Sequence, residues 1–129
     1  MARDPLRMCV RCDQFAPAAV REQMTRLSYL GWVLGDAMLV ASELVTNAVR
    51  HSRCTEDEYL SVFITRDGRL RISVLDPGRS GREAEIADRP IELGGLGLKV
   101  VEQLATDWGA DRHDDGYSVW AELDLSPAA

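Results

Sequence analysis

The sequence lacks several features that would place it in other classes of protein. Only one of its 129 residues is lysine, so Lys99 is the sole candidate for a catalytic lysine and the other basic residues are all arginine. No apolar run approaches the roughly 20 residues that a membrane-spanning helix requires. The segment 1–11 lacks the apolar core of a signal peptide. We therefore expect a soluble, cytoplasmic protein without a membrane partner.

Cysteine is also scarce, with Cys9, Cys12 and Cys54 as the three residues of this type. A small, odd number argues against a disulfide scaffold. The spacings Cys9-x-x-Cys12 and His51-x-x-Cys54 leave a zinc site open as an alternative. However, Cys9 and Cys12 lie in an expected strand, where residues three apart point to opposite faces. The favoured interpretation is that the cysteines are small, buried apolar side chains.

Length, composition and charge limit the domain organisation and the partners. Apolar residues make up 46% of the chain, which is typical of a globular protein. We expect a single domain over residues 1–129, with its core at about 8–125, because a chain of this length has room for one hydrophobic core. The net charge of −6 does not favour direct binding of nucleic acid.

Apolar periodicity and turn residues predict the order of the secondary structure. The expected elements are a strand at 7–13, helices at 17–30 and 35–52, strands at 60–65 and 70–75, a loop at 76–94, a helix at 95–106, and strands at 108–113 and 117–125. Asp67-Gly68 is a strong hairpin signal. Strands and helices do not alternate strictly, so we expect a mixed sheet with helices packed on one face rather than a doubly wound parallel sheet.

Glu43, Asn47 and His51 form the first group of residues suited to chemistry. They are four residues apart in the second expected helix, so they form one polar stripe on an otherwise apolar helix. A solvent-facing stripe is the simpler interpretation. The functional interpretation is that the Asn47 amide and the Glu43 carboxylate, one turn apart, hold a hydrated Mg²⁺ and orient a nucleophile.

A second candidate motif is Asp76-Pro-Gly78-Arg-Ser-Gly81, which follows the strand at 70–75. An aspartate at a strand end, followed by glycine, can present its carboxylate to a ligand that the backbone approaches closely. An ordinary turn is the alternative, because Asp, Pro and Gly all favour turns. By itself this motif decides little.

The third motif is Gly94-Gly95-Leu96-Gly97-Leu98, at the start of the last expected helix. Free N–H groups at the N-terminus of a helix, reached through glycines, can bind an anion. The spacing matches neither a Walker sequence nor a dinucleotide fingerprint, and a flexible hinge is the alternative interpretation.

Taken together, the three motifs resemble the GHKL (histidine kinase-like) superfamily of ATP-binding domains. Glu43, Asn47 and His51 resemble its N box, Asp76 and Gly78 its first glycine box, and residues 94–98 its second. Within the superfamily, Glu43-Leu-Val-Thr-Asn-Ala-x-x-His-Ser52 is most similar to the bacterial anti-sigma-factor serine kinases. The likeness runs from about Ala16 to Leu125.

This resemblance implies a two-layer α/β sandwich that binds ATP and Mg²⁺. It implies that Asp76 binds the adenine amino group, that Asn47 ligates Mg²⁺, and that Glu43 is the general base or orients the attacking group. It further implies backbone contacts to phosphate from Gly94, Gly95, Leu96, Gly97 and Leu98, with Gly78 in the first glycine box, Ser118 beside the adenine, and Arg50 and His51 near the ribose or phosphates.

The sequence departs from the family pattern at two places. Gly81 comes one residue later than the usual second glycine of the first box, and Tyr117 stands where many relatives carry lysine. A lid arginine, Arg79, Arg82 or Arg89, is a candidate replacement for that lysine. The loop from Pro77 to Leu93, with its charges, prolines and glycines, is expected to form an ATP lid.

The leading functional hypothesis from this resemblance is an anti-sigma factor that phosphorylates a serine of an anti-anti-sigma (STAS-type) partner and binds a sigma factor. Its alternatives are a non-catalytic ATP-dependent binding switch, a detached catalytic domain of a histidine kinase, and an interaction protein whose site has decayed. A homodimer is left open. The presence of Glu43 favours catalysis.

Overall fold

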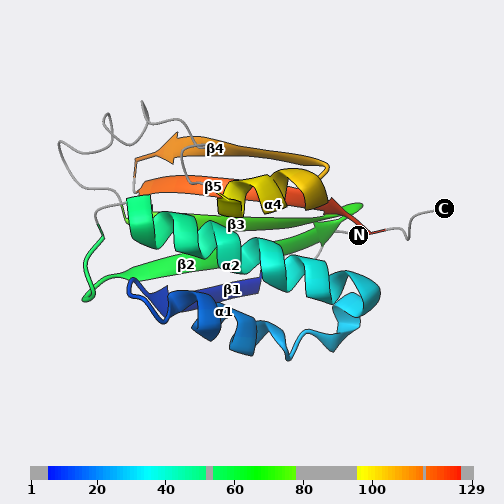
Figure 1. Cartoon of the computed structure of the whole chain (residues 1–129), viewed down its shortest axis with the longest axis horizontal. Helices are drawn as coiled ribbons and strands as arrows, with labels where there is room; N and C mark the ends of the chain where they lie inside the picture. The colour runs from blue at the N-terminus through cyan, green and yellow to red at the C-terminus, as the bar shows by residue number, and fades with distance from the viewer. Residues whose placement is uncertain (1–5, 52–53, 78–95, 115, 126–129) are drawn as a thin grey trace.

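The fold places helices on one side of an antiparallel sheet. The structure, a computed structural model, describes residues 6–51, 54–77, 96–114 and 116–125. Its elements are β1 (Leu6–Arg11), α1 (Ala16–Met24), the 3₁₀ helix η1 (Ser28–Val33), α2 (Leu34–His51), β2 (Tyr59–Asp67), β3 (Arg69–Pro77), α4 (Leu96–Leu104), β4 (Asp107–His113) and β5 (Gly116–Asp124). The predicted α/β sandwich is confirmed, with α1, α2 and α4 lying over the sheet in Figure 1.

The described strands form one sheet in the order β1-β2-β3-β5-β4, and neighbouring strands are antiparallel throughout. The expectation of a mixed sheet was therefore wrong in this detail. β3 and β4 do run in the same direction, but β5 lies between them and pairs with both. After α4 the chain forms β4 at the edge of the sheet, and β5 then pairs between β4 and β3.

The hydrophobic core lies between the sheet and the helices. On β3, alternation directs Leu70, Ile72 and Val74 to the helical side, because successive strand residues point to opposite faces. Strands β2 and β5 contribute matching buried residues to this side of the sheet. The buried apolar side chains of these two strands are Leu60, Val62, Ile64, Val119, Ala121 and Leu123.

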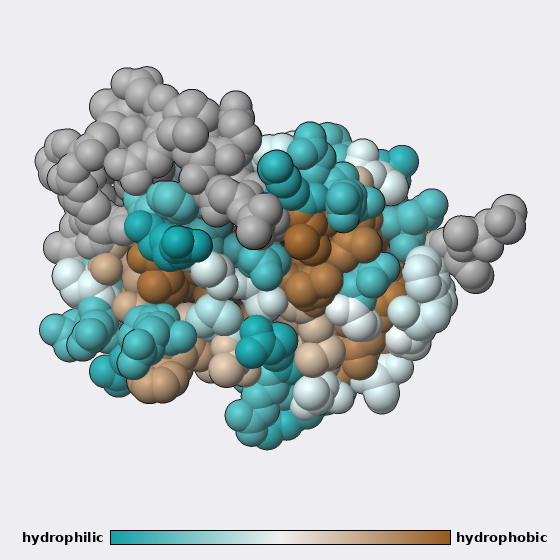
Figure 2. All heavy atoms as spheres, viewed as in Figure 1, coloured by the Kyte–Doolittle hydropathy of each residue, from teal (hydrophilic) through white to brown (hydrophobic). Residues whose placement is uncertain are grey.

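α2 is the helix that covers the centre of the sheet. Its buried residues recur at helical spacing, with Ala37, Val40, Ala41, Leu44, Val45 and Ala48 all turned to the core. By length and composition alone, the helical stretch Ser28–His51 could cross a membrane. Its apolar residues instead pack on β3 and β5, so it is a core helix of the domain. Figure 2 shows apolar residues gathered over α2 and α4 and hydrophilic residues around them.

The first helix is shorter than its apolar period predicts. α1 ends at Met24, where the Thr25 hydroxyl donates to the Glu22 carbonyl oxygen at 2.6 Å and the chain turns. The 3₁₀ helix η1 follows, and Gly31 has a φ of 59°, a conformation that glycine adopts without a steric penalty. Gly31 thus kinks η1 before α2 begins, whereas the predicted helix over 17–30 was wrong beyond Met24.

The other face of the sheet is not covered by any described helix. Arginine side chains stack on aromatic rings there, with the guanidinium carbon lying 4.1 Å from the ring centroid for Arg71 and Trp120, 5.5 Å for Arg11 and Tyr59, and 5.8 Å for Arg7 and Phe63. Arg71 also bonds the Glu122 carboxylate at 3.1 Å. These contacts keep the aromatic rings of this face covered by polar groups.

We predict that Leu44→Ala lowers the free energy of unfolding by about 2–5 kcal/mol, because a fully buried leucine would leave a cavity between α2 and the sheet. Urea unfolding followed by circular dichroism measures the loss. Leu39→Ala is the matched control, since Leu39 lies on the same helix and is 42% exposed. A loss at position 44 no larger than that at position 39 would contradict this account of the core.

Candidate functional site

Elements far apart in the sequence meet at one end of the molecule. Figure 1 shows α2 ending at the end of the sheet where β3 ends and β5 begins, and α4 starts toward the same end. Contacts of α2 with β3, β5 and α4 confirm that these elements are neighbours. Asn47 and His51, in the last two turns of α2, therefore lie at the same end of the fold as Asp76 on β3, and Glu43 lies one turn further back.

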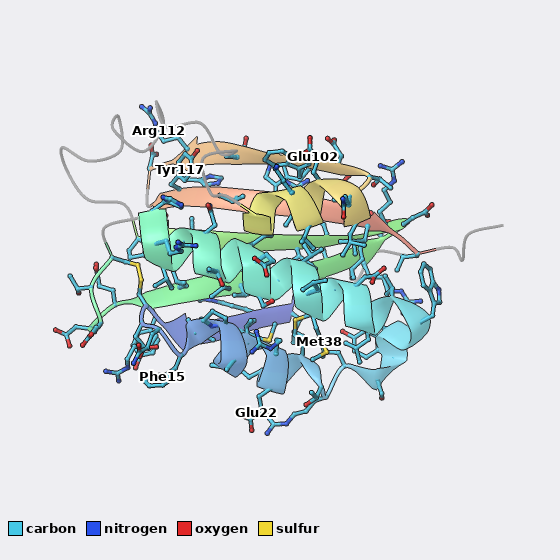
Figure 3. The ribbon with its side chains drawn as sticks, viewed as in Figure 1. Phe15, Glu22, Met38, Glu102, Arg112 and Tyr117 are labelled. Carbon is cyan, nitrogen blue, oxygen red and sulfur yellow. A yellow bond between two sulfur atoms is a disulfide. The ribbon has the colours of Figure 1, made fainter. Side chains whose placement is uncertain are left out.

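Glu43, Asn47 and His51 lie on one flank of α2. Met38, labelled in Figure 3, lies on the side of α2 that faces α1. Asn47 is nine residues further on, which corresponds to about 180° at 3.6 residues per turn, so Asn47 lies on the opposite flank, toward α4. Glu43, Asn47 and His51 are half-buried, whereas Arg50 is exposed. The polar stripe is thus a flank beside the core rather than the solvent face of the helix.

Asp76 is a carboxylate buried at the end of an apolar strand face. It continues the helix-facing series of β3 after Leu70, Ile72 and Val74, and it is only 4% exposed. A buried carboxylate is stable only when hydrogen bonds or charges compensate for lost hydration. Burial at this position therefore strengthens each hydrogen bond that the Asp76 carboxylate accepts.

Tyr117 lies directly opposite Asp76 in the β3–β5 ladder, and strand pairing puts their side chains on the same face. Burial, and then the charge of Asp76, raise the pKa of Tyr117 above its ordinary value of 10.0, while Arg112 acts in the other direction. Arg112 is the β4 residue opposite Tyr117, and Figure 3 shows the two at the same end of the sheet. Tyr117 is thus a neutral phenol at physiological pH, with an exposed cation beside it.

Gly116 allows the two strands to meet at Asp76. A Cβ atom added at Gly116 would collide with the carbonyl oxygen of Asp76, so any other residue would push β5 away from β3. Glycine at this position thus allows β5 to approach β3 closely enough for Tyr117 to lie beside the Asp76 carboxylate. The strands predicted at 108–113 and 117–125 did not reveal this role.

Ser118 is not brought together with Asp76. It pairs with Leu75 and points to the opposite face of the sheet, where its hydroxyl lies 2.8 Å from Nε2 of His113. There it lines a hollow of ≈ 310 Å³, together with Phe63, Arg71, Ser73, Leu75, Asp111 and His113. The predicted place of Ser118 beside the adenine does not fit this geometry. Strand alternation in the sequence predicts this orientation, because Tyr117, Val119 and Ala121 are two residues apart and point to the same face, whereas Ser118 points to the other.

The glycine-rich segment is described only in part. α4 begins at Leu96, so Gly97 and Leu98 fall in its first turn, where N–H groups lack partners within the helix. Gly78, Gly94, Gly95 and the predicted lid, including its arginines, lie outside the described residues. Lys99, the only lysine, is exposed on α4.

The cysteines differ from the prediction. Cys12 and Cys54 form a disulfide bond, although their small number argued against one, whereas Cys9 is a free, exposed thiol. Within the described ranges no group of three or more metal-binding side chains is present, so the alternative of a zinc site gains no support. Cys9 is exposed on β1, whereas Cys12 follows the end of that strand and is buried.

The geometry gathers groups suited to binding a nucleotide. A buried carboxylate lies at the end of β3, a carboxylate and an amide lie one turn apart on the α4-facing flank of α2, and the free N–H groups of α4 start nearby. These are acceptors for a base amino group, oxygen donors for a hard cation and donors for an anion.

We predict that Tyr117→Phe makes stability less sensitive to alkaline pH. Because the pKa of Tyr117 is raised in the folded protein, its stabilising contribution is fully present below about pH 10 and is lost as the pH rises through the folded value. Urea unfolding at a series of pH values from 8 to above 10 measures this slope. Tyr29→Phe, on the exposed η1, is the control, and equal slopes in the wild type and the Tyr117 variant would refute the prediction.

Comparison with known proteins adds a family to this geometry. The search of curated proteins found no match to the chain. Among solved structures, the crystal structure of the RsbU and RsbW domains of Rv1364c from Mycobacterium tuberculosis is similar in fold, with a TM-score of 0.69 and 24% sequence identity. The match covers 98% of this chain and 34% of that one, so the chain spans about a third of that protein. Residues 10–123 match the family described as the histidine kinase-like ATPase domain, to which this chain therefore belongs.

Proposed function

We propose that the protein binds ATP with Mg²⁺ and acts as an anti-sigma factor with serine kinase activity toward an anti-anti-sigma (STAS-type) protein. The observation that carries the proposal is the buried Asp76 at the end of the fold where the flank of α2 bears Glu43 and Asn47. Family membership supports nucleotide binding, and the N box sequence supports the finer assignment. On this proposal the protein acts in the cytoplasm and binds a sigma factor.

In the proposed complex, Asp76 accepts a hydrogen bond from the adenine amino group. Its burial excludes water from that bond, which strengthens it and makes recognition of the base specific. Tyr117 lies opposite Asp76 on the same face and offers a neutral ring and hydroxyl rather than a charge. We assign Tyr117, in place of Ser118, as the β5 residue that borders the base.

The phosphates extend from Asp76 toward α2 and α4 in the proposed complex. Asn47 would hold a hydrated Mg²⁺ through its amide oxygen, because it is half-buried on the flank that faces α4. When bound, this ion neutralises phosphate charge. Glu43 orients the attacking serine hydroxyl and accepts its proton. The first N–H groups of α4, at Leu96, Gly97 and Leu98, bind phosphate oxygens.

A non-catalytic binding switch is the second candidate function. The observation that favours it is Tyr117, because a phenol on β5 supplies no positive charge to phosphate where many relatives carry lysine. Arg112 on the neighbouring strand is a cation on the same face, and it supports the catalytic alternative. Both functions require ATP binding and differ only in phosphoryl transfer.

Asp76→Asn should weaken ATP binding by about 10- to 100-fold, since it removes a charged hydrogen-bond acceptor without changing the size of the side chain. Isothermal titration calorimetry with ATP and Mg²⁺ measures the dissociation constant. Asp111→Asn, on β4 and on the other face of the sheet, should bind as the wild type does. Failure of the wild-type protein to bind millimolar ATP would end the proposal.

Glu43→Ala and Asn47→Ala should separate catalysis from binding. The Glu43 variant should lose about 10²–10⁴-fold in phosphoryl transfer and keep most of its ATP affinity, because a general base acts on the nucleophile. The Asn47 variant should lose both. Transfer from labelled ATP to candidate STAS-type proteins is the assay, with Glu102→Ala on the exposed side of α4 as the control. A wild-type protein that binds ATP yet neither transfers nor hydrolyses it would be the non-catalytic switch.

A further inference from the structure

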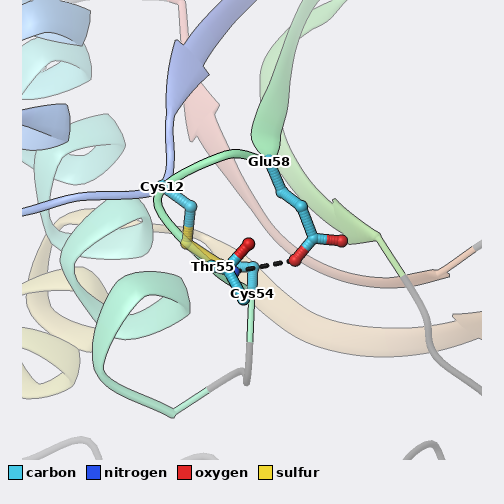
Figure 4. Close-up of a disulfide and its surroundings, with 4 residues drawn as sticks. All are labelled: Cys12, Cys54, Thr55 and Glu58. Atoms are coloured by element: carbon cyan, nitrogen blue, oxygen red, sulfur yellow. Dashed lines mark hydrogen bonds between the residues drawn. A yellow bond between two sulfur atoms is a disulfide. The ribbon is translucent and has the colours of Figure 1, made fainter.

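A disulfide joins the end of β1 to the segment that follows α2. Cys12 and Cys54 are separated by 42 residues in the sequence, and their Cα atoms lie 6.2 Å apart, within the range of unforced disulfides. Figure 4 shows the bond between the strand and the loop, beside Thr55 and Glu58. This bond plays no part in the proposed phosphoryl transfer.

The disulfide belongs to a small anchored loop. The Cys12 N–H donates to the Glu58 carbonyl oxygen at 2.9 Å, which extends the β1–β2 contact beyond the strand. The Thr55 N–H donates to Oε1 of Glu58 at 2.7 Å, and the Glu58 N–H donates to the Thr55 carbonyl oxygen at 2.9 Å. These hydrogen bonds hold the loop 54–58 together, whereas the disulfide is the covalent link between the loop and β1.

The same bond anchors the outgoing end of the helix that carries the proposed site. α2 ends at His51, three residues before Cys54, and Asn47 lies about one turn before His51. A covalent link at residue 54 therefore limits how far the last turn of α2 can move relative to the sheet. Because Asp76 is fixed in the sheet, that limit applies to the relative position of Asn47 and Asp76.

The two sulfur atoms differ in accessibility. Cys12 is 4% exposed, whereas Cys54 is half-buried, so a soluble reductant reaches the Cys54 sulfur more readily. The free thiol Cys9 is exposed on the uncovered face of the sheet. In a cytoplasmic protein a disulfide is more often redox-sensing than structural.

We propose that Cys12 and Cys54 are a reversible redox-modification site that adjusts nucleotide affinity by anchoring or releasing the end of α2. The inference rests on the proposed nucleotide site. The disulfide form holds Asn47 in place relative to Asp76 and binds ATP with Mg²⁺ more tightly. The dithiol form keeps the hydrogen bonds of loop 54–58 but loses the covalent anchor, so the end of α2 moves more freely and binds more weakly.

The reductant in this exchange is a dithiol. One of its thiolates attacks Sγ of Cys54, the S–S bond breaks, and the Cys12 sulfur leaves as a thiolate that takes a proton. The second thiol then attacks the mixed disulfide, releases Cys54 and leaves the reductant oxidised to a disulfide. In the reverse direction hydrogen peroxide oxidises one thiol to a sulfenic acid with loss of water, and the other thiol displaces a second water to form the disulfide.

The test compares the oxidised and dithiothreitol-reduced protein in two measurements. Calorimetry with ATP and Mg²⁺ should show affinity about fivefold or more higher for the oxidised form. Hydrogen exchange without nucleotide should show greater protection of residues 44–51 and 54–59 in that form. Cys54→Ser should behave as reduced protein in both buffers, and Cys9→Ser, the matched control, should respond as the wild type does.

The outcomes separate this inference from the proposed function. Equal ATP affinity and equal hydrogen exchange in the two redox states would overturn the redox site while leaving nucleotide binding intact. If neither form binds ATP, the proposed function fails. Hydrogen exchange then still tests the anchor: a difference between the redox states supports it, and equal exchange overturns it. Recovery of Cys12 and Cys54 as free thiols by alkylation and mass spectrometry, after treatment with hydrogen peroxide, would also overturn it.

Discussion

The burial of one carboxylate on an apolar strand face is the constraint from which the rest of the candidate site follows. Asp76 occupies a position where the period of β3 would otherwise place another aliphatic residue, and it is as buried as the core around it. Because burial removes the hydration of the carboxylate, hydrogen bonds or charges around it must compensate for the lost water. Gly116 brings β5 against the Asp76 backbone, and that close approach places Tyr117 beside the carboxylate. The pairing of β3 with β5 thus shapes the surroundings of Asp76.

α2 combines two roles that constrain one another. Leu44 and Ala48 hold the helix on the sheet, and Glu43 and Asn47, the residues directly before them, project from the adjoining flank. The packing of the apolar face therefore sets the position of the polar pair, since any rotation of the helix moves both faces together. A helix that is a core element is rigid enough to hold metal and nucleophile geometry, which a surface loop would hold less well.

Local pattern predicted most of the elements, and the sequence motifs named residues that the fold brings toward one end of the molecule, whereas long-range pairing decided what remained. Asp67-Gly68 and the apolar period of α2 depend on neighbours in sequence, and both were predicted correctly. The face on which Ser118 lies depends on the register with β3, and the family analogy overrode the strand alternation that would have placed it. The Cys12–Cys54 bond joins residues 42 apart. Spacing alone does not determine which cysteines meet in three dimensions.

The pairing of β4 with β5 also determines which charged group lies beside Tyr117. In an antiparallel pair, residues directly opposite each other share a face and lie close together. Arg112 is opposite Tyr117, so a cation lies on the adjacent strand, and its charge acts to lower the pKa of Tyr117 against the larger, raising effects of burial and Asp76. The phenol keeps the surroundings of Asp76 uncharged, while the guanidinium lies further out, where it is exposed. The buried carboxylate and the solvated cation thus lie on one face of the sheet but on different strands.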